Sequence, residues 1–238
     1  MQQFLWEYYS QLTKFVEVLA AVVGILMYSK FRYTPVKYFI WILVGIASVE
    51  MIGGYTGYVE DYNFLSDLKE KLAGTWLEEN NWFYTLFWEI GATLAFAYYF
   101  RSLLTNQTHK TIIKTVAAGF VVASMVIIAS NFEAFFVRSF PAISILSALV
   151  IIFSVVLYLV QILQSDELLD FYKMPNFYFA ATLLIWILIT TPVIFYDVYF
   201  STDDPDYVTL KYSIFLFSNI FMYLTFTLSL IWCKPKNS

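Results

Sequence analysis

Three glutamates inside long apolar segments are the residues of this chain with the clearest chemical potential. They are Glu17, Glu50 and Glu89. Each lies about five to seven residues from one end of its segment, and these three ends fall on the same side of the predicted bundle. A carboxylate at membrane depth costs at least about 2.5 kcal/mol on insertion scales, so such residues are functional candidates by default. We therefore consider the three as a candidate site for a ligand, a proton or a cation.

The neighbours at helical spacing indicate which way each glutamate faces. Small residues share a face with each one: Thr13, Ala20, Ala21 and Gly24 with Glu17; Ala47, Gly53, Gly54 and Gly57 with Glu50; Thr85, Ala92 and Thr93 with Glu89. Small residues mark helix–helix contacts in a bilayer, because close packing drives association there. We expect the carboxyls to face a bundle interior. There they are either protonated and hydrogen-bonded or hold a cation, with Lys14 as an internal partner of Glu17.

Other polar residues extend this candidate site. Asn219 lies in the last apolar segment and Asn131 at the end of the fourth, and both are candidate ligands. Pro192 falls in the last turns of the sixth segment, where it is expected to kink the helix as a hinge or to end it early. Four aspartates form a predicted acidic rim: Asp197, Asp203, Asp204 and Asp206. An acidic rim concentrates cations and repels anions.

The composition places these residues in a membrane. The chain has 238 residues, of which 60% are hydrophobic and only 13% are charged, and its mean hydropathy is +0.67. An average soluble domain carries roughly 25% charged residues. An ordinary soluble enzyme, a nucleic-acid-binding module and a disordered chain are therefore excluded. One cysteine and one histidine also exclude an intramolecular disulfide and a Cys/His metal cluster, and no cofactor is expected.

Seven segments have the roughly 20 mostly apolar residues that a membrane-spanning helix needs. They cover about 12–29, 37–56, 82–100, 113–131, 141–163, 176–196 and 209–232. Such uniformly apolar runs exclude a transmembrane barrel, whose strands alternate. The sequence thus predicts an all-α, polytopic seven-transmembrane-helix bundle in a single domain, residues 1–238. The longest connector, 57–81, is expected to form an amphipathic surface helix.

The distribution of lysine and arginine predicts the orientation, since cytoplasmic loops are enriched in them. Nine fall on one side of the predicted bundle: Lys30, Arg32, Lys37, Arg101, Lys110, Lys114, Lys173, Lys234 and Lys236. Five fall on the other: Lys14, Lys69, Lys71, Arg138 and Lys211. The side with nine is expected to be cytoplasmic, which places the N-terminus outside, the C-terminus in the cytoplasm and the glutamates near the outer surface.

Motifs of known chemistry are missing. The middle of the seventh segment has no lysine, which excludes a retinal Schiff base of the kind found in microbial rhodopsins. The chain also has no phosphate-binding loop, no HExxH and no GxSxG. We therefore do not expect an enzyme.

Three functions remain open. The first is a membrane protein that senses or binds a small ligand or cation in an outer-facing acidic pocket and relays this to a partner protein. The second is a proton or cation channel or transporter that uses the glutamates, and the third is a lipid-modifying membrane enzyme. The expected surroundings are the lipid bilayer, taken here as a bacterial inner membrane, with a cytoplasmic or membrane partner, a second copy of the chain, or both. Nucleic acid is not expected.

Overall fold

The chain folds into a bundle of long helices. The computed structural model describes residues 2–62, 65–165, 169–196 and 205–235, and no strand occurs among them. The longest helices are α1 (Gln2–Phe31), α2 (Val36–Gly53), α7 (Gln107–Ser130), α9 (Pro141–Leu163), α10 (Pro175–Tyr196) and α11 (Pro205–Trp232). The prediction of an all-α chain is confirmed.

Six helical segments are long and apolar enough to cross a membrane. They are Tyr8–Phe31, Val36–Glu60, Gln107–Ser130, Pro141–Leu163, Pro175–Tyr196 and Tyr207–Trp232. The chain therefore has the character of a multi-pass membrane protein. The other expected segment, 82–100, lies in a helical stretch made of α5 (Asn81–Phe83), the π-helix η2 (Tyr84–Ala92) and α6 (Thr93–Leu103). It is helical throughout, but it is not a regular α-helix.

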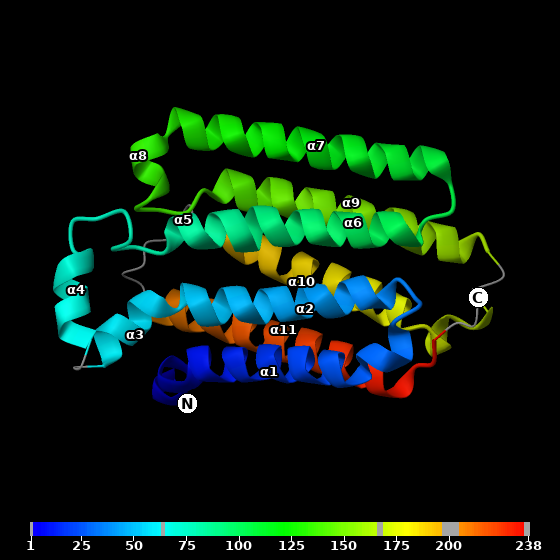
Figure 1. Ribbon diagram of the computed structural model, residues 1–238, viewed down its shortest axis with the longest axis horizontal. Helices are drawn as coiled ribbons and strands as arrows, with labels where there is room; N and C mark the ends of the chain where they lie inside the picture. Colours follow the sequence, from blue (N-terminus) through cyan, green and yellow to red (C-terminus); the bar gives the residue numbers. More distant parts are fainter. Residues whose placement is uncertain (1, 63–64, 166–168, 197–204, 236–238) are drawn as a thin grey trace.

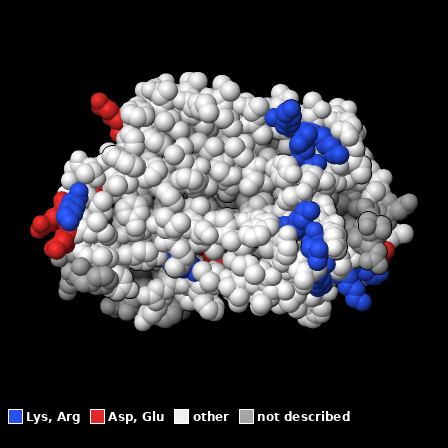
Figure 2. Space-filling view, viewed as in Figure 1, with Lys and Arg blue, Asp and Glu red and all other residues white. Residues whose placement is uncertain are grey.

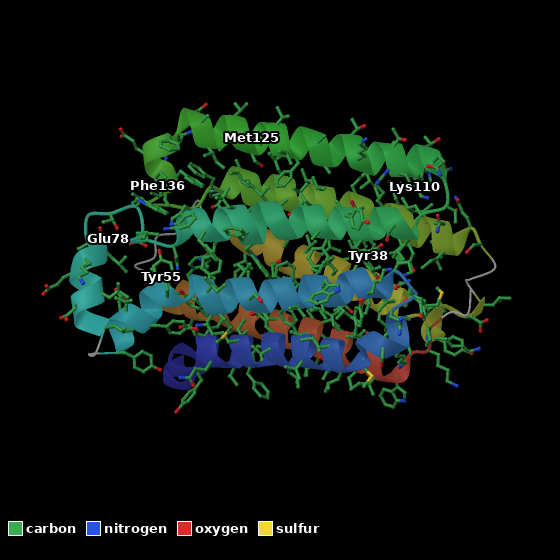
Figure 3. The ribbon with its side chains drawn as sticks, viewed as in Figure 1. Tyr38, Tyr55, Glu78, Lys110, Met125 and Phe136 are labelled. Atoms are coloured by element: carbon green, nitrogen blue, oxygen red, sulfur yellow. The ribbon has the colours of Figure 1, made fainter. Side chains whose placement is uncertain are left out.

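The helices form a closed ring with one helix outside it. Around the ring, α1 packs against α2, α2 against η2 and α6, α6 against α9, α9 against α10, α10 against α11, and α11 against α1. Helix α7 packs on the outside, against α6 and α9 (Figure 1). It is the least buried of the six apolar helices, and Met125 is one of its exposed side chains (Figure 3).

Local chemistry explains where several helices begin. Pro141 and Pro175 are the first residues of α9 and α10, where a missing N–H costs nothing. The Asn106 side chain caps α7 by accepting a 2.8 Å hydrogen bond from the Thr108 amide. Pro192 lies inside α10, and the helix continues beyond it to Tyr196. The expectation that Pro192 ends the helix early is therefore wrong.

The connector 57–81 folds as short pieces at one end of the bundle. It contains most of α3 (Tyr55–Asp61) and all of α4 (Ser66–Leu72), which contact each other. Just after α4, Gly74 has a φ of +73°, a conformation that favours glycine. The Tyr55 hydroxyl donates a 2.7 Å hydrogen bond to the Leu77 carbonyl, which fixes the end of the connector against α3. The connector is thus two short helices and a turn where one amphipathic helix was expected.

Charge separates along the bundle axis. Figure 2 shows acidic side chains around α4 and α8 (Phe132–Phe135), and most of the visible basic side chains at the opposite end. In Figure 3, Glu78 and Tyr55 lie at the α4 end, whereas Lys110 and Tyr38 lie at the other. Helix α1 begins at the α4 end and α11 ends at the opposite one (Figure 1). We call the α4 end the acidic end and the other the basic end.

In the half of the helix ring toward the basic end, aromatic side chains fill the interior. Phe39 of α2 stacks on Phe179 of α10, with ring centroids 3.7 Å apart. Phe226 of α11 meets Phe39 edge-on at 4.9 Å, and Tyr99 of α6 contacts it at 5.2 Å. All four are buried. We call them, together with Phe96, the aromatic cluster.

Candidate functional site

A cavity of about 310 Å³ lies inside the ring, between the aromatic cluster and the acidic end. Each helix of the ring contributes to its wall: α1, α2, the η2–α6 stretch, α9, α10 and α11. Helix α7 contributes nothing. The polar residues of the wall are Tyr9, Ser10, Thr13, Glu17, Glu50, Tyr84, Glu89, Thr93, Ser144, Ser147, Thr190, Thr191, Asn219 and Tyr223. The three sequence-predicted glutamates therefore line one common space.

Glu17 and Glu50 form one side of this cavity. Glu17 of α1 is only 5% exposed, whereas Glu50 of α2 is half-buried. The two carboxyls are close enough to interact electrostatically, and the Tyr223 and Tyr84 hydroxyls lie beside Glu17 and Glu50, respectively.

Glu89 is held by a polar network between η2–α6 and α9. Its carboxyl oxygen Oε1 accepts a short hydrogen bond from the Ser144 hydroxyl. One turn along, the Thr93 hydroxyl donates to the Glu89 backbone carbonyl at 2.5 Å and lies 2.5 Å from the Ser147 hydroxyl. These contacts join two helices through side chains that all line the cavity. Glu89 is therefore positioned by a neighbouring helix and not only by its own.

The π-helical segment explains how Tyr84 and Glu89 reach the same cavity. In an α-helix, residues five apart point about 140° away from each other. In a π-helix the hydrogen bonds run from residue i to i+5, so residues five apart lie almost one above the other. Since η2 spans Tyr84–Ala92, both side chains face the ring interior. Short π-helical insertions occur often at functional sites.

Two glycines let bulky groups approach α2 at the cavity. A Cβ on Gly53 would lie 2.9 Å from Tyr84 Cζ, and one on Gly54 would lie 2.8 Å from Lys14 Nζ. The ammonium of Lys14 donates to the Tyr58 hydroxyl at 3.3 Å and lies over the Tyr58 ring. Among the described residues it forms no close ion pair with Glu17, but its charge acts on both Glu17 and Glu50. The expected partnership with Glu17 is therefore an electrostatic interaction at longer range, and the direct contact of Lys14 is with Tyr58.

Of the other residues that the sequence singled out, some line the cavity and others do not. Asn219 lines the cavity and accepts a 2.7 Å hydrogen bond from the Trp186 indole N–H. Asn131 is exposed at the end of α7 and its amide bonds the Ile127 carbonyl, so it is not part of the cavity. Pro192 follows the lining residue Thr191 but does not line this cavity, and it borders a separate pocket between α10 and α11. Of the predicted rim, Asp197, Asp203 and Asp204 lie outside the described residues, and Asp206 lies in the first turn of α11.

Sequence reasoning missed the aromatic and hydroxyl residues of the wall. They are Tyr9, Tyr84, Trp88, Ser144, Ser147, Trp186 and Tyr223. Ser144 and Ser147 carried a usable signal, because two hydroxyls at helical spacing in the fifth segment mark a helix–helix face. The aromatic residues carried none, since the same residue types crowd every interface in this chain.

Several buried polar atoms of the wall have no hydrogen-bond partner. These are Oε2 of Glu17, the hydroxyl of Tyr223, the hydroxyl of Thr13 and Oε2 of Glu89. A buried polar atom left without a partner costs about 1–3 kcal/mol. An occupant of the cavity that pairs with these oxygen atoms, water included, would recover this cost.

The wall is not arranged for a metal ion. Among the described residues, no group of three or more His, Cys, Asp or Glu side chains converges closely enough to hold one.

Comparison of the chain with protein-family models, with curated protein sequences and with solved structures gives no match in any of the three. The candidate function therefore depends on the geometry of this cavity.

Proposed function

We propose that this protein binds a small ligand or cation in the ring cavity and relays its presence to a partner protein. The observation that supports this most is the shared wall: six helical stretches of the ring converge on one space that contains three carboxyls and several unpartnered oxygens. An occupant that contacts all of them changes how the helices pack together. A signal could therefore leave through the connectors at the basic end, 101–114 and 164–175.

The proposal includes a membrane topology. Besides the six apolar helices, Asn81–Leu103 would also cross the membrane, which gives seven spans, an outer N-terminus and a cytoplasmic C-terminus. The basic end would then face the cytoplasm, in keeping with the enrichment of lysine and arginine there. The proposed location is a bacterial inner membrane.

The topology is testable with single cysteines. Cys233 is changed to serine, and Thr105→Cys at the basic end is compared with Glu79→Cys at the acidic end. Burial raises the pKa of the Cys233 thiol, and the neighbouring Lys30 ammonium only partly opposes this. The native thiol is therefore expected to react slowly with a maleimide, and the change to serine removes the reaction that remains. An impermeant maleimide should label position 79 in intact cells and position 105 only after lysis. Strong labelling of position 105 in intact cells would reverse the topology.

The second candidate function is proton or cation transport through the same cavity. The three carboxyls favour it, because acidic residues inside membrane helices mark ion pathways. The aromatic cluster counts against it, because four of its buried aromatic side chains fill the centre of the helix ring between the cavity and the basic end. A pathway would require these rings to move apart.

Flux through liposomes separates the two candidates. We expect no proton or K⁺ flux above that of empty liposomes, together with a protein that copurifies in mild detergent. Flux that disappears in Glu50→Gln and Glu89→Gln, but persists in the matched surface variant Glu133→Gln, would favour transport instead. Glu133 is a suitable control because it is exposed on α8.

A further inference from the structure

The chemistry of the cavity wall restricts the occupant to one class. Three unpartnered oxygens of the wall belong to side chains that are more than nine-tenths buried: Glu17 is 5% exposed, Tyr223 1% and Thr13 7%. All three line the cavity from α1 and α11. An ionised carboxylate only accepts hydrogen bonds, so an occupant that pairs with Glu17 in this form brings a donor to this side of the wall.

The wall is acidic and has no basic side chain among the residues that the structure describes. It contains three carboxyls and no lysine, arginine or histidine. Lys14 acts on Glu17 and Glu50 electrostatically from outside the wall, where its ammonium donates to the Tyr58 hydroxyl. A buried charge requires a partner, since desolvation without one is costly. A cationic occupant would supply the partner that these carboxyls need in their ionised form.

The walls between the carboxyls suit an organic cation better than a bare metal ion. The carboxyls do not converge on one point, and most of the remaining surface is apolar or aromatic. Trp88 and Trp186 both line the cavity, and tryptophan is the strongest aromatic partner of an ammonium group. A volume of about 310 Å³ is at the lower end for ligand pockets and fits a small molecule.

From these observations we infer that the cavity takes a small organic ammonium cation. Its nitrogen lies between Glu17 and Glu50 and donates to the unpartnered Glu17 oxygen, and its apolar body packs against Trp88 and Trp186. This inference rests on the proposed function and deepens it, because it names the chemical class of the ligand.

Binding is measured on the full chain in dodecyl maltoside micelles, by calorimetry and tryptophan fluorescence. The probes are butylammonium, 1,4-diammoniobutane and phenethylammonium, with 2-phenylethanol as the neutral match for the last and K⁺ and Mg²⁺ as inorganic cations. We expect at least one ammonium probe to bind saturably. The alcohol should bind at least about tenfold more weakly than phenethylammonium, a ratio that corresponds to about 1.4 kcal/mol.

Matched variants locate the binding. Glu17→Gln should weaken ammonium binding at least about tenfold, whereas Glu133→Gln on the exposed α8 should not change it. Trp186→Phe keeps a ring but removes the indole, and should reduce the fluorescence change and weaken binding by a smaller factor. If Glu17→Gln does not fold by circular dichroism, Glu50→Gln takes its place.

The outcomes distinguish the inference from the function on which it rests. Saturable binding of K⁺ or Mg²⁺ that no ammonium probe displaces would overturn the inference and leave the proposed function intact. Equal binding of 2-phenylethanol and phenethylammonium would do the same, because the site would then not distinguish a charged ligand from a neutral one. If no probe of any kind binds and no partner copurifies, both the inference and the proposed function are wrong.

Discussion

The two halves of the ring are built from the same helices but have opposite interiors. Toward the basic end, Phe39, Phe179, Phe226 and Tyr99 interlock and are buried. Toward the acidic end, the same helices carry carboxyls, hydroxyls and alanines around a cavity. The change is visible along α9, where Ser144, Ser147 and Ala148 line the cavity but Val155 and Tyr158 are buried in the packed half.

This difference indicates a division of labour. In lipid the hydrophobic effect does not hold helices together, so they depend on close packing and interhelical hydrogen bonds. The aromatic half supplies the close packing, which allows the other half to stay open and to leave polar atoms without partners. If this is correct, equivalent substitutions in the two halves should have unequal consequences for stability and for binding.

The largest expected difference is between two phenylalanines. Phe179→Ala removes a fully buried ring from the aromatic cluster and should lower the free energy of unfolding by about 3–5 kcal/mol. Phe215→Ala removes a half-buried ring from the cavity wall and should cost about 1–2 kcal/mol, because a side chain that borders a void makes fewer contacts. Unfolding by SDS in dodecyl maltoside micelles, followed by circular dichroism, measures both. Equal losses would remove the distinction between the halves.

Added volume should have effects of opposite sign in the two halves. Ala180→Leu places a larger side chain at a fully buried position of α10 and should cost about 1–3 kcal/mol through overpacking. Ala148→Leu places the same group into the cavity, so stability should be unchanged or higher while binding of the ammonium probes is lost. The same unfolding assay and the fluorescence titration test this pair. A destabilised Ala148→Leu protein would indicate that the cavity is already filled.

Several features of this division were within reach of the sequence. Small residues at helical spacing correctly directed Glu17, Glu50 and Glu89 to one interior, because close helix packing requires such residues in any membrane bundle. The bounds of α9 and α10 also followed from hydropathy and from the positions of Pro141 and Pro175. Hydropathy placed the starts of α1 and α7 too late, because polar first turns precede their apolar segments. These features depend only on neighbours along the chain.

Features that depend on the packing order of the helices were not predictable. Asn131 resembled a ligand because hydropathy does not reveal that α7 lies outside the ring. Helical spacing named Glu17 as the partner of Lys14, but it did not reveal the direct contact of Lys14 with Tyr58 of α3. The π-helix that brings Tyr84 and Glu89 to the same cavity also left no recognisable pattern in the residue types. Each of these is decided by contacts between segments that lie far apart in sequence.

Glycine substitutions on α2 compare the cavity with the outer surface of the ring. A Cβ on Gly53 would meet Tyr84 Cζ at 2.9 Å, so Gly53→Ala must displace the Tyr84 ring that lines the cavity. We expect a stability loss of about 1 kcal/mol and weaker ammonium binding. Gly45→Ala meets nothing within 4 Å and should raise stability by about 0.5–1 kcal/mol, because alanine favours the helix. Unchanged binding by Gly53→Ala would mean that the position of Tyr84 does not matter.

Two serines one heptad apart on α9 give the smallest and most local test. Ser147 lies at the cavity and contacts the Thr93 hydroxyl at 2.5 Å, whereas Ser154 is buried in the packed half and donates only to the Val150 carbonyl of its own helix, at 2.8 Å. Interhelical hydrogen bonds in membrane proteins average about 0.6 kcal/mol. Ser147→Ala should therefore lower the free energy of unfolding by about that amount. Ser154→Ala should change it less, because its hydroxyl joins no other helix. If Ser154→Ala costs more, the packed half depends on polar contacts as well as on its aromatic rings, and the contrast between the two halves would have to be drawn by side-chain volume alone.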